Sequence, residues 1–205
     1  MWKFMKHYAL EIYTVIAMLL IVCVAIFAKE LTIIQKFTVF LSFVYILHEW
    51  EENHYPGGFL ELMEKNLLKM EVGDEAKRGS RLITAVFIFA FTIVPFFFGD
   101  AIPMFVVAMA VFSIFEGIVH IAGIRLHRLT KPYTPGMFTA VIELIVGIAL
   151  IVYLAVNHLA LWYDYVVAPF IFLVCFALMQ RTLMATIGLG YKDMIKIVKN
   201  KFKEG

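Results

Sequence analysis

Charged residues are scarce in this chain of 205 residues, in which lysine, arginine, aspartate and glutamate together make up only 17%. An ordinary soluble domain needs roughly a quarter of such residues to cover its surface. Hydrophobic residues make up 62% of the sequence, and the mean hydropathy is +0.87. The composition therefore excludes a typical water-soluble protein and predicts an integral membrane protein. We expect it in the plasma membrane of a prokaryote, in contact with membrane lipids.

Several familiar chemical signatures are also missing. The two cysteines, Cys23 and Cys175, lie in separate apolar runs, so we interpret them as small hydrophobic side chains rather than a disulfide or a metal pair. No glycine-rich loop joins a strand to a helix, which excludes a phosphate loop or a dinucleotide fingerprint. The formal net charge of +2 gives no reason to expect a nucleic-acid partner. The oligomeric state stays open.

What the sequence does contain is a series of apolar segments. The hydrocarbon core of a bilayer is about 30 Å thick, so a helix needs about 20 residues to cross it. Six segments qualify, and they cover about residues 9–28, 32–52, 81–98, 102–124, 137–156 and 165–187. The second is charged at one end and the third is short, so five spans are the alternative. We predict one all-α domain over residues 1–205, a polytopic membrane helix bundle with about six transmembrane helices.

Two further segments are predicted to lie at the membrane surface. Residues 59–72 place Leu60, Met63 and Leu67 on one helical face, with Glu61 and Lys65 mostly opposite. This pattern predicts a short interfacial amphipathic helix, and a solvated linker helix is the alternative. Residues 192–205 form a basic tail that we expect to lie against the anionic inner leaflet.

The positions of the basic residues indicate the orientation. With six spans and the N-terminus in the cytoplasm, every lysine and arginine except Lys29 and Lys36 falls on the inside. The outer loops around residues 99–103 and 157–165 have no basic residue. Because cytoplasmic loops are enriched in these residues, we predict that both termini are cytoplasmic.

A run of ionisable residues ends the second predicted span. His48, Glu51 and Glu52 share a narrow helical face, and Pro56 with the two glycines after it ends that helix. The fourth span carries Glu116 and His120 one turn apart, and the fifth carries Glu143. Under the predicted topology, all six side chains lie roughly 5 to 15 Å below the inner interface. We expect them to meet at one point.

This coincidence predicts a metal site. One buried His or Glu alone is most simply a satisfied core residue, but each ionisable group deep in a membrane helix costs about 2.5 to 3.5 kcal/mol. A bound divalent metal contributes on the order of 10 kcal/mol in favourable sites. We predict that His48, Glu51, Glu52, Glu116, His120 and Glu143 hold one or two ions of zinc, iron or manganese, the charge balance leaning towards two. The alternative is a protonated polar network or proton path.

The chain resembles the HXXEE family of predicted integral membrane proteins, whose name is the motif His48-Glu49-Trp50-Glu51-Glu52 here. His120 matches a second histidine of that family. Residues 131–136 resemble its R-x-Y-x-P-G segment, with Lys131 in place of the arginine. The resemblance implies a shared site, and it implies no particular reaction.

Three functions are consistent with these residues. The first is a metal-dependent membrane enzyme, hydrolytic or of di-iron oxidative type, that acts on an amphiphilic or lipid-like small molecule from the inner leaflet. In the hydrolytic version, Glu52 is the general base. The alternatives are a proton- or cation-coupled transporter that uses the same carboxylates, and a non-catalytic protein with a structural metal. Four residues beside the site are candidates for binding an anionic head group: Arg125, Arg128, Lys131 and Tyr133.

Overall fold

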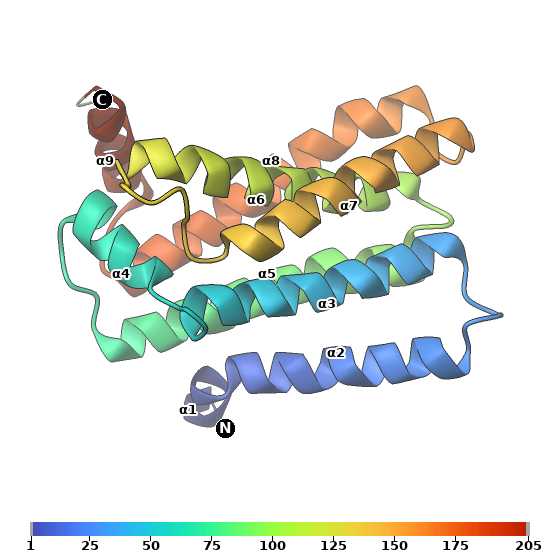
Figure 1. Cartoon of the computed structure of the whole chain (residues 1–205), viewed down its shortest axis with the longest axis horizontal. Coiled ribbons are helices and arrows are strands. Elements are labelled where there is room, and N and C mark those ends of the chain that lie inside the picture. Colours follow the sequence, from blue (N-terminus) through green and yellow to red (C-terminus); the bar gives the residue numbers. More distant parts are fainter. Residues whose placement is uncertain (1, 204–205) are drawn as a thin grey trace.

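The computed structural model describes residues 2–203, so that residue 1 and the end of the predicted basic tail, residues 204–205, lie outside the described residues. In this part of the chain all regular secondary structure is helical and no strand forms, which confirms the predicted all-α membrane fold (Figure 1). The helices are α1 (Trp2–His7), α2 (Ala9–Ile26), α3 (Ile33–Asn53), α4 (Phe59–Met63), the π-helical turn η1 (Glu64–Leu68), α5 (Asp74–Phe98), α6 (Pro103–Leu126), α7 (Met137–Val156), α8 (Trp162–Thr186) and α9 (Tyr191–Lys203).

Five helices of the described chain are long and apolar enough to cross a membrane, namely α2, α5, α6, α7 and α8. The protein is therefore an integral membrane protein. Helix α3 runs beside them along the bundle (Figure 1), but it does not belong to this group, and its last turns carry His48, Glu49, Glu51 and Glu52. Six spans and cytoplasmic termini stay predictions.

Helix α6 lies at the centre of the bundle. Half of the residues in its most apolar 18-residue stretch are buried, whereas only 11% are buried in the corresponding stretch of α8. Helix α6 packs against α5, α7 and α8. Helix α3 fills the other side and packs against α2, α5 and α7. Gly117 lets α6 and α7 approach closely, because a Cβ there would lie 2.8 Å from the carbonyl oxygen of Ala140. The end of α3 is thereby held beside both α6 and α7.

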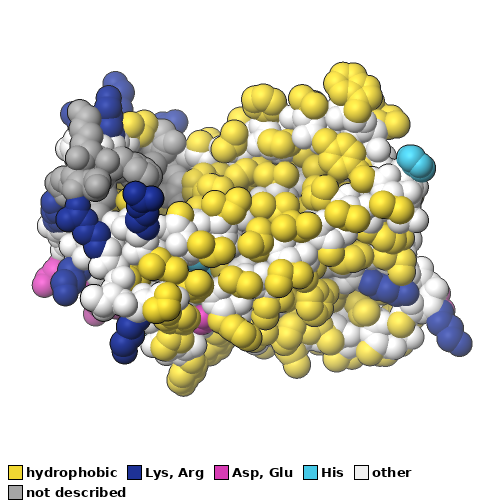
Figure 2. Space-filling view, turned by 45° about the horizontal axis from the view of Figure 1, so that its top comes forward, with side chains coloured by type: hydrophobic (Ala, Val, Ile, Leu, Met, Phe, Trp, Pro, Cys, Tyr) yellow, Lys and Arg dark blue, Asp and Glu magenta, His cyan; other side chains and the backbone are white. Residues whose placement is uncertain are grey.

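Hydrophobic side chains cover the middle of the molecule, while most of the basic side chains in this view gather at one end (Figure 2). A belt of apolar surface is what a bilayer requires of a helix bundle that crosses it. This distribution agrees with the prediction that the basic end faces the cytoplasm.

Two element boundaries differ from the apolar segments. Helix α5 begins at Asp74 rather than near residue 81, because Asp74 and Glu75 favour the positive end of a helix dipole and extend the helix beyond its apolar part. Of residues 59–72, only 59–68 are helical: they form α4 followed by the π-helical turn η1, which ends before Lys69. Glu64 holds this segment, since it accepts a 2.7 Å hydrogen bond from the Val72 backbone N–H and pairs with Lys77 at 3.1 Å.

The predicted topology places the loop between α5 and α6 outside the cell. In a Cys23→Ser, Cys175→Ser background, the exposed Ala101→Cys variant should react with an impermeant maleimide in intact cells. The exposed Lys131→Cys variant should react only after permeabilisation, because its loop follows α6 on the inside. The reverse labelling pattern would show five spans or an inverted chain.

Candidate metal centre

Two histidines from different helices face one carboxylate. His48 lies near the end of α3 and His120 near the end of α6, and both are buried. Their rings meet edge to face, with centroids 4.8 Å apart. The Oε1 atom of Glu52 lies 3.5 Å from Nε2 of His48 and 3.3 Å from Nε2 of His120. The two Nε2 atoms are thus directed at the same place.

The other ring nitrogen of His48 is held by α7. Its Nδ1 lies 3.0 Å from both the Gly136 carbonyl oxygen and the Thr139 hydroxyl. A carbonyl oxygen only accepts hydrogen bonds, and the Thr139 hydroxyl donates its own proton to Glu51 over 2.6 Å. Nδ1 of His48 must therefore carry the proton. In the neutral ring this leaves the Nε2 lone pair available to a metal.

His120 is fixed in the same way. Its Nδ1 lies 3.0 Å from the Thr134 hydroxyl, and that hydroxyl donates its proton to the His120 carbonyl oxygen over 3.2 Å. Nδ1 is again the donor, and the Nε2 lone pair is free. Two imidazoles oriented by hydrogen bonds to their far nitrogen are the usual arrangement of metal-binding histidines.

Gly136 allows these two rings to come together. It begins α7 with a positive φ of 89°, a conformation that glycine adopts without strain. A Cβ on Gly136 would lie 2.8 Å from Cε1 of His48, 2.8 Å from Cε1 of His120 and 2.7 Å from Cγ of Glu52. The site is therefore shaped around a backbone with no side chain.

Glu116 completes the cluster from one turn before His120. Its Oε2 lies 3.9 Å from Nε2 of His120. One ligand atom from each of His48, Glu116 and His120 lies within 4.8 Å of the others, so these residues could hold a metal ion. Imidazole nitrogen and carboxylate oxygen are the ligands of zinc and of other first-row divalent metals.

Glu51 and Glu143 lie on the Nδ1 side of His48. Glu51 accepts hydrogen bonds from the Tyr133 hydroxyl, the Thr139 hydroxyl and the backbone N–H groups of Phe138 and Thr139, over 2.6 to 3.1 Å. Burial and this contact raise the pKa of Tyr133, so its phenol remains a donor. Glu143 is fully buried, with Oε1 3.9 Å from Nδ1 of His48, and neither of its oxygens has a hydrogen-bond partner among the described residues.

A profile of the family described as "Protein of unknown function with HXXEE motif" matches residues 39–152, which is more than half of the chain. The chain belongs to this HXXEE family. The matched segment contains both histidines, the carboxylates around them and Gly136. No curated protein and no solved structure matches the chain. The family resemblance predicted from the sequence is confirmed.

One wall of a cavity of about 620 Å³ contains the histidine cluster, which we define as His48, Glu52, Glu116 and His120. Most of the remaining wall of this cavity is apolar. Leu60, Met63 and Leu67, the apolar face predicted for an interfacial helix, line this cavity. Five phenylalanines from α4, α5, α6 and α8 complete its aromatic part: Phe59, Phe87, Phe112, Phe115 and Phe176.

The structure thus brings together four of the six predicted ligands, namely His48, Glu52, Glu116 and His120. The other two, Glu51 and Glu143, lie on the Nδ1 side of His48. Of the residues predicted to hold a head group, Tyr133 binds Glu51, and Arg125, Arg128 and Lys131 do not line the cavity. Sequence reasoning missed the hydroxyls that orient the histidines. Thr134 lies within the Tyr-x-Pro-Gly segment and Thr139 three residues after Gly136, so their closeness to that segment was the available signal.

We expect Gly136→Ala to weaken zinc binding by at least about tenfold, because a Cβ would push the two rings and Glu52 apart. The matched control is Gly188→Ala, since Gly188 also has a positive φ, 75°, and has no neighbour within 4 Å of an added Cβ. Competition titration with a zinc chelator, alongside thermal unfolding, separates the two effects. Equal zinc affinity in both variants would show that the crowding at Gly136 does not reach the site.

Proposed function

We propose that this protein is a zinc-dependent membrane hydrolase whose substrate is an amphiphilic small molecule. The observation that carries the proposal is the pair of Nε2 atoms, each fixed as an acceptor, that face one carboxylate in the wall of a largely apolar cavity. Two histidines and a carboxylate with an open fourth position form a common catalytic zinc set.

The spacing of the ligand atoms supports an assignment of the ligands. His48, His120 and Glu116 would hold the ion, since their ligand atoms already lie within 4.8 Å of one another. A zinc ion supplies Lewis-acid polarisation of the scissile bond and lowers the pKa of water. Glu52 lies against both Nε2 atoms and is the carboxylate best placed to take the proton of the attacking water.

The cavity supports an amphiphilic substrate. Its volume of about 620 Å³ is within the usual range for small-molecule sites, and its phenylalanines and leucines would surround a hydrocarbon or aromatic part. The polar end of the substrate would then lie at the histidine cluster. A molecule of this kind is expected to partition into the inner leaflet and to reach the site from the membrane.

The spacing of the ligands supports a hydrolytic rather than an oxidative reaction. The oxidative di-iron bundles use a Glu-x-x-His motif on each of two helices, and this chain has no such pair. The single group of His48, Glu116 and His120 found among the described residues matches one ion better than two. We therefore favour hydrolysis over oxidation.

Purified protein should contain about one equivalent of zinc per chain, as a three-residue ligand set requires. His48→Ala and His120→Ala should each reduce the zinc content at least about tenfold, whereas His158→Asn, at a distant exposed histidine with a positive φ, should retain it. Elemental analysis by mass spectrometry measures the content. Less than about a tenth of an equivalent after zinc reconstitution would refute the metal site.

The Glu52→Gln variant tests whether Glu52 is a general base or a metal ligand. This variant should keep its zinc and lose about 10²- to 10⁴-fold of the hydrolysis rate, measured on a panel of ester, amide and phosphodiester amphiphiles. Loss of zinc together with activity would make Glu52 a ligand. Iron in place of zinc would keep the metal site and overturn the hydrolytic assignment.

Glu143→Gln should have opposite effects on stability and on zinc. It replaces a fully buried ionisable group by a neutral amide of nearly the same shape, and a neutral amide costs less to bury than a carboxylate, so the metal-free protein should become more stable by about 1 to 3 kcal/mol. Zinc affinity should fall about tenfold, because a carboxylate behind His48 raises the basicity of that ligand.

Detergent-denaturation curves and chelator competition measure the two effects of Glu143→Gln. Glu30→Gln, at an exposed position outside the site, is the control and should change neither. An unchanged zinc affinity in Glu143→Gln would show that Glu143 does not act through His48.

A further inference from the structure

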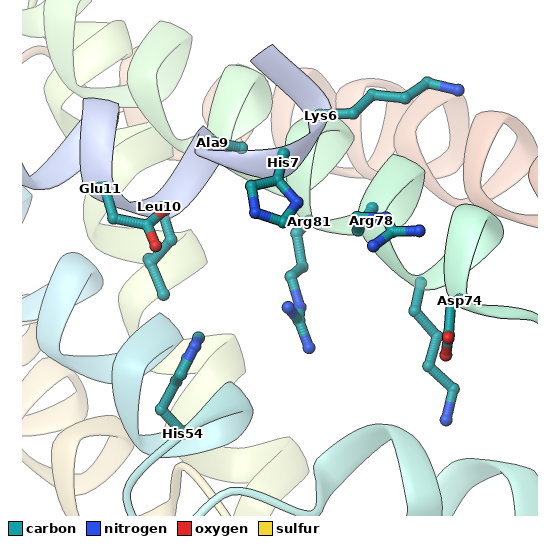
Figure 3. A pocket seen from close by; sticks show the side chains of 10 residues that line it. Lys6, His7, Ala9, Leu10, Glu11, His54, Asp74, Arg78 and Arg81 are labelled. Atoms are coloured by element: carbon teal, nitrogen blue, oxygen red, sulfur yellow. The ribbon is translucent and has the colours of Figure 1, made fainter. Parts of the chain in front are cut away.

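A second, basic pocket opens at the same end of the bundle as the histidine cluster. It has a volume of about 280 Å³ and is bounded by α1, the start of α2, the end of α3 and the first turns of α5 (Figure 3). Four helices that are separate in sequence thus contribute to one opening. Its lysine and arginine side chains are Lys6, Lys77, Arg78 and Arg81, joined by His7 and His54.

The basic side chains of this pocket differ in their partners. Four cationic and two acidic side chains line it, the acidic ones being Glu11 and Asp74. Lys77 pairs with Glu61 and Glu64, and Lys6 pairs with Glu75. Across residues 2–203, neither Arg78 nor Arg81 forms an ion pair with a carboxylate. Within this range, two arginines of the pocket are therefore left without a carboxylate partner.

Arg81 is held in a defined position. Its Nε donates a 3.0 Å hydrogen bond to Oδ1 of Asn53, and Asn53 in turn donates to the Glu49 carboxylate over 3.3 Å. Figure 3 shows Arg81 reaching into the middle of the opening, with His7 above it, His54 to its lower left and Arg78 to its right. Because its Nε is already bonded, the terminal NH₂ groups remain to bind an anion.

We propose that this basic pocket binds a phosphate group. A phosphate ester carries a charge of about −1.5 to −2 at neutral pH, and two arginines without a carboxylate partner in the described chain could bind it. The arginine fork suits its oxygens, and two histidines can add donors. A volume of about 280 Å³ accommodates phosphate together with a short attached group. The source is either a soluble phosphate compound or the head group of an anionic phospholipid, since the pocket lies at the basic end predicted to face the inner leaflet.

Arg78→Gln tests the proposal most cleanly, because Arg78 forms no ion pair or side-chain hydrogen bond with the described residues that would be lost with its charge. In the first arm, inorganic phosphate is titrated calorimetrically into full-length protein in an uncharged detergent at low ionic strength. The wild type should show saturable binding of one phosphate, and Arg78→Gln should weaken it at least about tenfold. Lys65→Gln, which removes an exposed basic residue outside the pocket, should weaken it less than about twofold.

The second arm distinguishes the source of the phosphate. Protein taken from vesicles of phosphatidylglycerol and phosphatidylcholine is examined by native mass spectrometry. Retention of one phosphatidylglycerol by the wild type and its loss in Arg78→Gln would support a lipid head group. Phosphate binding that depends on Arg78 without lipid retention would support a soluble ligand.

Arg81→Gln and Arg81→Lys complete the series, and thermal unfolding shows whether loss of the Asn53 contact destabilises the protein. Arg81→Lys keeps the charge, so it should retain more phosphate affinity than Arg81→Gln. The zinc content of Arg78→Gln should equal that of the wild type, which separates this site from the metal centre. Absence of saturable binding in both arms, or equal losses in Arg78→Gln and Lys65→Gln, would overturn the proposal.

Discussion

The carboxylate of Glu51 fixes the relative position of α3 and α7, and the metal centre depends on that position. It accepts hydrogen bonds from two backbone N–H groups in the first turn of α7, where the helix dipole favours a negative charge. It also accepts from the hydroxyls of Tyr133 and Thr139. The same turn presents Gly136 and Thr139 to Nδ1 of His48, so the contact that joins the helices also orients the ligand.

Glu51 acts in this way because it lies in an apolar bundle. A buried carboxylate is costly unless its oxygens are satisfied, and four donors at 2.6 to 3.1 Å satisfy this one. Glu143 is the contrasting case, since its buried oxygens have no donor in the structure. This contrast agrees with a site in which Glu51 has a structural role, whereas the cost of burying Glu143 depends on a group that binds nearby.

The sequence predicted the fold class and the convergence of α3, α6 and α7, because apolar lengths and helical periodicity set them. His48 and Glu52 are one turn apart, as are Glu116 and His120, and these pairs do meet. The direction of Glu51 could not be predicted, since it depends on where the backbone of α7 begins. The cavity could not be predicted either, because the side chains that α4, η1 and α8 contribute to it are almost all apolar. The long α5 was missed because apolar length does not count its polar first turns.

The three consecutive polar positions after Trp50 have different partners. Glu51 binds α7, Glu52 faces both histidines, and Asn53 accepts a hydrogen bond from Arg81 of α5. Successive helical residues point about 100° apart, so one turn of α3 can reach three neighbouring helices only if each position has its own side chain. An insertion of one residue would turn all three away from their partners. The two adjacent glutamates of the motif are therefore not interchangeable: the first positions α7, and the second faces the space between the two histidines.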